Sequence, residues 1–150
     1  MITSMDVTKT QQDGGMKYYP HVIPYLDYFL PSEEQAMLLA GTEDVEAMAD
    51  FFLKGGVKCV VIKLGSRGCF CKTAQLSFYC GCYDVPVVET TGAGDAFVAG
   101  FLSGVLRNGS MEDCVRLGGR CFRARYSMCR CQYGHSGSEN AAGIYRDASS

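Results

Sequence analysis

The chain has 150 residues, of which 47% are hydrophobic and 20% are charged, and its formal net charge is −2. This composition indicates a folded globular protein and argues against a disordered chain. The small negative charge argues against a nucleic-acid partner. Apolar runs are short and the N-terminus has no basic region followed by an apolar one, so we expect no membrane partner and a cytoplasmic location.

In chain order, the sequence first predicts two short strands. They are expected at residues 2–7 and 28–30, with a polar loop at 8–15 between them. A helical turn is expected at residues 22–26, and Pro24 limits its length.

Two helices are predicted next. Ser32 is an N-cap, and it is followed by Glu33 and Glu34 in the first turn, where carboxylates favour the positive end of the helix dipole. The apolar face of this first helix is expected to carry three residues: Met37, Leu38 and Leu39. The second helix covers residues 44–54, since apolar residues recur there at helical spacing.

A buried strand and two glycine turns follow. Residues 58–64 form the near-continuous apolar run of a buried parallel strand, and residues 65–68 turn the chain into two further short strands. After a second glycine turn, helices are expected from about Asp95 to Arg107 and from Ser110 to about Leu117. This alternation predicts an α/β fold with a largely parallel central sheet, in which ligands bind beyond the carboxyl ends of the strands.

The nine cysteines do not form an obvious metal or disulfide pattern. Cys69 and Cys71, like Cys80 and Cys82, are two residues apart in strand-like segments, where such residues merely share a face. Zinc knuckles usually use wider spacings. We therefore expect buried or half-buried free thiols that pack as small hydrophobic side chains.

The run Thr90-Thr91-Gly92-Ala93-Gly94-Asp95-Ala96-Phe97 carries the clearest functional signal. A glycine turn that opens into a helix leaves backbone N–H groups without partners, with the positive end of the helix dipole behind them. Such a turn is suited to phosphate or to a developing oxyanion. A carboxylate in the first turn, Asp95, is suited to accept a proton there. From these residues alone, the alternative is that Asp95 caps a helix and the glycines make a turn.

This run closely resembles the signature of the pfkB/ribokinase family of carbohydrate kinases. Residues 61–68 resemble the nucleotide-binding strand and turn of that family, and residues 30–36 resemble its segment near magnesium and phosphate. The three segments occur in the family's order, and the resemblance covers residues 1–117. It implies a ribokinase-like three-layer α/β/α fold whose N-terminal half is absent from this chain.

The resemblance implies ATP-dependent phosphorylation of a sugar or related alcohol, with ATP and Mg²⁺ as cofactors. Asp95 would take the hydroxyl proton. The transferring phosphoryl group would be held by the backbone amides of Gly92, Ala93 and Gly94. The residues expected to border the nucleotide are Lys63, Gly65, Ser66, Gly68 and Thr91, and those expected near the metal are Glu34 and Gln35. The alternative for Lys63 is a strand-end lysine in solvent.

Three departures from the family pattern affect this interpretation. Glu89 replaces an Asp, and Gln35 replaces an acidic residue, which weakens the expected organisation of magnesium. Family members are also longer, and the half that supplies most sugar contacts is missing here. The uncovered sheet would favour self-association.

The segment 118–150 forms a separate, divergent region in this interpretation. It shows no clear period and is rich in Arg and Cys near its start. One hypothesis is a reading-frame shift, because codons for residues 131–136 read one base later can spell Ala-Asn-Thr-Gly-Ile-Gln, close to the family's adenine-side loop. The other is a divergent, partly disordered tail.

The leading functional hypothesis is a fragment of a sugar kinase with little or no activity of its own. A second is a non-catalytic nucleotide- or phosphate-binding module derived from such a kinase. A third is a related kinase for a nucleoside or a vitamin precursor.

Overall fold

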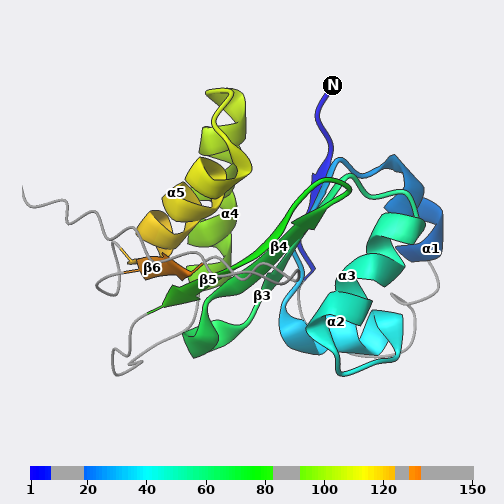
Figure 1. The fold of residues 1–150 in the computed structure, drawn as a ribbon. Helices are drawn as coiled ribbons and strands as arrows, with labels where there is room; N and C mark the ends of the chain where they lie inside the picture. The colour runs from blue at the N-terminus through cyan, green and yellow to red at the C-terminus, as the bar shows by residue number, and fades with distance from the viewer. Residues whose placement is uncertain (8–18, 83–91, 124–128, 133–150) are drawn as a thin grey trace, which may run out of the picture.

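A six-stranded sheet lies between two layers of helices (Figure 1). The computed structural model of the chain describes residues 1–7, 19–82, 92–123 and 129–132. Helices α1, α2 and α3 lie on one side of the sheet, and α4 and α5 lie on the other. The predicted three-layer α/β/α fold is therefore confirmed.

The strands follow one another in the sheet in chain order. Their bounds are β1 (Ser4–Met5), β2 (Tyr28–Phe29), β3 (Cys59–Lys63), β4 (Cys69–Thr73), β5 (Ser77–Cys82) and β6 (Cys129–Gln132). β1, β2 and β3 pair in parallel, and the pairings from β3 to β6 are antiparallel. The parallel strands thus bring their carboxyl ends to one edge of the sheet.

The helices agree with the expected order. Their bounds are α1 (Tyr19–Val22), η1 (Ile23–Tyr25), α2 (Glu33–Ala40), α3 (Val45–Lys54), η2 (Gly65–Arg67), α4 (Ala93–Leu106) and α5 (Met111–Arg123). Helix α2 begins at the predicted cap Ser32, whose side chain accepts from the N–H of Gln35. Helix α3 begins at Asp44, whose side chain accepts from the N–H of Ala47.

Three predictions of local structure need correction. Leu38 does not lie on a buried face, since it is 63% exposed. Helix α2 instead approaches the core through the small side chain of Ala36, which is buried. Helix α5 continues past Leu117 to Arg123, and β6 was not predicted. The pairing of β6 with β5, rather than any local period, makes residues 129–132 a strand.

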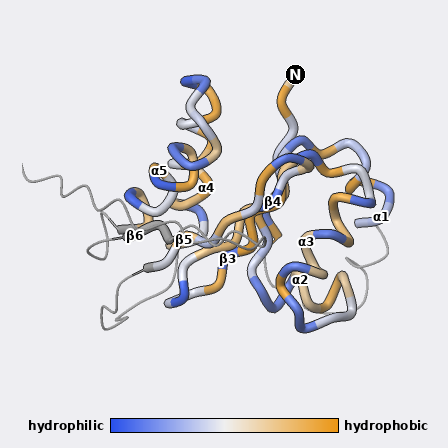
Figure 2. The backbone as a smooth tube through the Cα atoms, viewed as in Figure 1, coloured by the Kyte–Doolittle hydropathy of each residue, from blue (hydrophilic) through white to orange (hydrophobic). Residues whose placement is uncertain are grey.

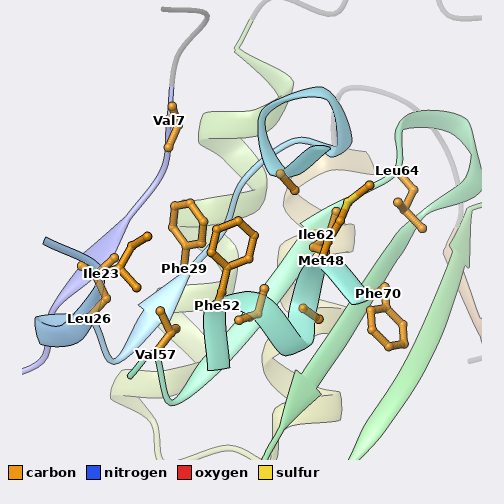
Figure 3. Packing of buried hydrophobic residues seen from close by; sticks show 13 residues of the cluster. Val7, Ile23, Leu26, Phe29, Met48, Phe52, Val57, Ile62, Leu64 and Phe70 are labelled. Atoms are coloured by element: carbon orange, nitrogen blue, oxygen red, sulfur yellow. The ribbon is translucent and has the colours of Figure 1, made fainter. Parts of the chain in front are cut away.

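The two faces of the sheet are packed differently. Side chains alternate along β3, so that Val60 and Ile62 face α1–α3, whereas Cys59 and Val61 face α4 and α5. On the first face, Phe29 and Phe52 meet edge to face at 4.8 Å between ring centroids (Figure 3). Hydrophobic residues run through the adjoining strands β3 and β4 (Figure 2). Within the described residues, no helix combines the length and apolarity needed to cross a membrane.

The second face carries a layer of thiols. Cys69, Cys71 and Cys80 are buried in the hydrophobic cluster on this face, which confirms their predicted packing role. The Sγ atoms of Cys59 and Cys71 lie 3.8 Å apart. The hydrogen bond to Cys59, together with burial, raises the pKa of the Cys71 thiol far above its ordinary value. The Cys71 thiol therefore stays protonated, and the small size of the cysteine side chains on this face lets α4 and α5 lie close to the sheet.

Candidate phosphate and nucleotide site

Helix α4 begins at the predicted glycine turn without a side-chain cap. Gly92 is the N-cap residue and adopts the left-handed conformation, with φ of 78°. This conformation favours glycine because a Cβ atom would be strained there. The first N–H groups of α4 lack partners inside the helix, and the dipole adds positive charge at the same point. The arrangement is suited to an anion.

Lys63 and Asp6 lie at this helix N-terminus. Lys63 is the last residue of β3, and its Nζ donates to Asp6 Oδ1 at 2.7 Å. The side chains are only 17% and 23% exposed, respectively. A methyl group built on Gly94 would lie 3.3 Å from Lys63 Nζ and 3.9 Å from Asp6 Oδ2. An ammonium group is thus held against the first turn of α4, which excludes the alternative of a lysine in solvent.

The glycine turn at residues 65–68 lies at the same edge of the sheet, because it follows β3 directly. Gly65 has φ of 61°, and among the described residues other than its chain neighbours no atom lies within 4 Å of a Cβ placed there, so a ligand has room to approach the backbone. Gly68 has a different role: a Cβ there would lie 1.8 Å from the carbonyl oxygen of Cys80. Ser66 is exposed in the turn. Arg67 forms an ion pair with Glu33, which connects this turn to the first turn of α2.

The residues expected near the metal lie in the first turn of α2. Glu34 is exposed. Gln35 completes a capping box, in which its Oε1 accepts from the N–H of Ser32 at 2.7 Å. The Gln35 amide also donates to the carbonyl of Val7. The oxygen and the nitrogen of the Gln35 side-chain amide therefore both form hydrogen bonds within the protein. In the described part of the chain, no group of three or more His, Cys, Asp or Glu side chains is arranged to hold a metal ion.

Glycines also set the position of α4. A Cβ on Gly100 would lie 2.5 Å from the carbonyl oxygen of Leu117, and a Cβ on Gly104 would lie 2.7 Å from the Cα of Cys114. Helices α4 and α5 therefore approach to backbone contact at positions that admit only glycine without a shift. This contact holds the N-terminus of α4 at the sheet edge.

Most of the predicted site residues converge at one edge of the sheet. Gly92, Ala93 and Gly94 form the start of α4, and Asp95 is exposed in its first turn. Thr91 and Glu89 lie outside the described residues. Sequence reasoning missed Asp6, although one signal existed: an acidic residue near the carboxyl end of the first predicted strand, at residues 2–7.

The donor set fits a polyphosphate better than it fits an isolated metal ion. The uncapped helix start, the open Gly65 position and the Lys63 ammonium are features that bind phosphate oxygens. Magnesium bound with a nucleotide needs only one or two protein carboxylates, since phosphates and waters complete its shell. Asp6 and Glu34 are carboxylates at this edge.

The fold and this site define an α/β protein whose sheet is suited to hold an anion at its carboxyl edge. The model of the family "pfkB family carbohydrate kinase" matches residues 4–127. The chain therefore belongs to the pfkB family of carbohydrate kinases, and its fold is ribokinase-like.

Similar proteins include several sugar kinases. The chain is 42% identical to 2-dehydro-3-deoxygluconokinase of Bacillus subtilis (strain 168) over 93 residues, which are 61% of this chain and 29% of that protein. It is 35% identical to an uncharacterized sugar kinase of Archaeoglobus fulgidus over 115 residues, which are 77% of this chain and 46% of that protein. The chain thus spans less than half the length of these curated relatives.

Solved structures with this fold include a ribokinase from Thermotoga maritima. That structure superposes with a TM-score of 0.68 at 30% identity, over 78% of this chain and 39% of the ribokinase. A protein from E. coli that was solved in complex with ATP and Mg²⁺ gives a TM-score of 0.65 at 27% identity, over 71% of this chain and 34% of that protein.

Proposed function

We propose that this chain is the phosphate-holding and catalytic part of an ATP-dependent kinase that phosphorylates a hydroxyl of a sugar or related alcohol. The observation that carries the proposal is the start of α4, where an uncapped glycine turn faces the half-buried ammonium of Lys63. The similarity to 2-dehydro-3-deoxygluconokinase supports a sugar-type acceptor, and the E. coli neighbour bound to ATP and Mg²⁺ supports the cofactors.

Each residue has a distinct role in this proposal. The amides of Gly92, Ala93 and Gly94 hold negative charge at the phosphoryl group, and the helix dipole reinforces them. Lys63 places a positive charge beside the same point. Asp95, exposed in the first turn of α4, accepts the proton of the acceptor hydroxyl. Bound ATP supplies the phosphoryl group, and residues 65–68 border the nucleotide.

We further propose that the 150-residue chain binds ATP but transfers phosphate slowly or not at all. In phosphoryl transfer, positioning and electrostatic stabilisation supply most of the catalysis, so an acceptor must be held in line with the phosphoryl group. The chain spans 29% of the length of 2-dehydro-3-deoxygluconokinase and 46% of that of the Archaeoglobus sugar kinase. A chain that spans such a small share of the length of these kinases is not expected to contain a complete acceptor pocket.

Two measurements on the purified chain test the proposal. Titration calorimetry with a non-hydrolysable ATP analogue is expected to give saturable binding. Sugar-dependent release of ADP is expected to be absent or very slow, and Asp95→Asn serves as the control for the proton acceptor. Lack of nucleotide binding would refute the proposed site. Rapid sugar phosphorylation that is lost in Asp95→Asn would refute only the proposed inactivity of the chain.

A further inference from the structure

Asp6 connects three elements at the carboxyl edge of the sheet. It follows β1 directly, and its Oδ1 accepts from the N–H of Val7 at 2.8 Å and from Lys63 Nζ at 2.7 Å. The ion pair reaches across the end of β2, because β2 lies between β1 and β3. The second carboxylate oxygen faces Gly94 in α4, since a Cβ there would lie 3.9 Å from it. The carboxylate that follows β1 thus contacts the last residue of β3 and faces α4.

The segment that carries Asp6 is itself held in place. Val7 is 7% exposed and belongs to the core on the α1–α3 face. Its carbonyl accepts a hydrogen bond from Gln35, whose Oε1 caps α2. The Asp6 carboxylate is therefore fixed by neighbours on both sides, and it has little freedom to move away from Lys63.

Electrostatics explains why a carboxylate is needed at this point. The start of α4 carries positive charge from its dipole and from its N–H groups, and such charge repels an ammonium group. Lys63 is nonetheless held there at 17% exposure. The Asp6 carboxylate offsets this repulsion, because a charge-assisted hydrogen bond in a partly buried place is stronger than one in water.

We infer that Asp6 is a positioning residue, which holds the Lys63 ammonium beside the start of α4 so that Lys63 contacts the phosphates of the nucleotide. This inference rests on the proposed function. It assigns Asp6 an action through Lys63 rather than a contact with the acceptor or the reacting atoms. A rival role has the opposite consequence: if Asp6 only neutralised Lys63 and competed with phosphate for it, its removal would make Lys63 bind phosphate better.

A double-mutant cycle separates these roles. The affinity of a non-hydrolysable ATP analogue is measured by calorimetry for the unmodified chain and for Lys63→Met, Asp6→Asn and the double variant. The buffer contains EDTA, so that an effect of Asp6 on a metal ion does not contribute. The single Asp6→Asn effect combines loss of the placed ammonium with removal of a negative charge near an anion, so the informative quantity is the effect of Lys63→Met in each background.

The inference predicts strong non-additivity. Lys63→Met is expected to weaken binding about tenfold when Asp6 is present, as loss of one charge-assisted contact does. In the Asp6→Asn background the same substitution is expected to change affinity less than about threefold, since Lys63 is no longer held in place. Asp6→Glu keeps the charge and is expected to restore part of the Lys63→Met effect. Asp6→Ala repeats the cycle without an added amide, and circular dichroism verifies that each variant folds.

Three results overturn the inference. Equal effects of Lys63→Met in both backgrounds would show that Asp6 is merely structural, and a larger effect without Asp6 would show that it competes with phosphate. Both leave the proposed function standing, because the unmodified chain binds nucleotide. A chain that binds no nucleotide would refute the proposed function, and the inference with it.

Discussion

Helices α3 and α4 begin in opposite ways, although both pack on the same sheet. At α3, the Asp44 carboxylate accepts from the N–H of Ala47 at 3.0 Å and thereby fills the helix N-terminus. Helix α2 begins with the capping box of Ser32, and α5 begins after Ser110, whose Oγ accepts from the N–H of Asp113. Among the described helices of at least eight residues, α4 alone starts at a glycine without a side-chain cap.

This difference separates structural helix starts from one that is available to a ligand. A side-chain cap accepts hydrogen bonds from the first N–H groups of a helix and stabilises the helix by about 1 kcal/mol. Helix α4 lacks this stabilisation. All four helices have acidic residues in their first turns, and at α4 the Lys63 ammonium adds a positive charge at the same place. A substitution at the capped start of α3 should change only the stability of the chain, whereas a substitution that disturbs the start of α4 should also change nucleotide binding.

The largest expected loss of stability comes from Gly104→Ala, which is expected to lower both the stability of the chain and its affinity for ATP. Its Cβ would lie 2.7 Å from the Cα of Cys114, a backbone atom that has to move. Overpacking of this kind costs about 1–3 kcal/mol of unfolding free energy, measurable by urea denaturation. The shift of α4 is also expected to weaken ATP binding. Leu106→Ala, at a position that is 75% exposed, is the matched control and should change stability by less than about 0.5 kcal/mol.

Gly92→Ala tests the turn itself. The φ of 78° at Gly92 is costly for a residue with a Cβ atom, by about 1–2 kcal/mol. We expect a loss of this size in the unfolding free energy and a weaker affinity for ATP, because the first N–H groups of α4 change direction. Unchanged stability would mean that Gly92 does not need the left-handed conformation.

Asp44→Ala removes the cap of α3 and provides the counterpart at a structural helix start. The expected loss is about 1 kcal/mol of unfolding free energy, as for other N-cap carboxylates. ATP affinity should remain the same, since this helix start holds no ligand in our account. An Asp44→Ala chain that lost ATP binding while remaining folded would remove the distinction between the two kinds of helix start.

The smallest expected effect comes from the ion pair at the opposite end of β3, between Lys58 and Asp27 at 2.5 Å. The hydrogen bond from Lys58, together with hydrogen bonds from Thr3, lowers the pKa of Asp27 from 3.8 to about 2. A lowered pKa contributes stability that is present above the ordinary value and lost as the pH falls through the folded value. The difference in melting temperature between the chain and Asp27→Asn should therefore be constant above about pH 5 and shrink as the pH falls to about 2. A difference that is the same at pH 2 as at pH 5 would contradict this assignment.

The sequence was sufficient for those features that depend on local chemistry. Ser32 and the glycine turn at residues 92–94 lie where capping and backbone rules put them. The alternation of elements gave the α/β class, and the family resemblance implied the three layers. Asp6 was missed because its partner lies 57 positions away and on the far side of β2, which only the strand order reveals. Similarly, β6 exists through pairing with β5, and Leu38 is exposed because Ala36 makes the close contact of α2.

Gly94→Ala tests whether the start of α4 holds the phosphates of a nucleotide. Alanine suits a helix interior better than glycine by about 0.5–1 kcal/mol, so the melting temperature should stay the same or rise. The added methyl group would lie 3.3 Å from Lys63 Nζ and would fill the space between the ammonium and the helix. Calorimetry should then show ATP affinity reduced about tenfold or more, equivalent to ~1.4 kcal/mol, whereas Ala99→Ser on the exposed side of α4 should bind as the unmodified chain does. A folded Gly94→Ala chain with unchanged ATP affinity would contradict the account.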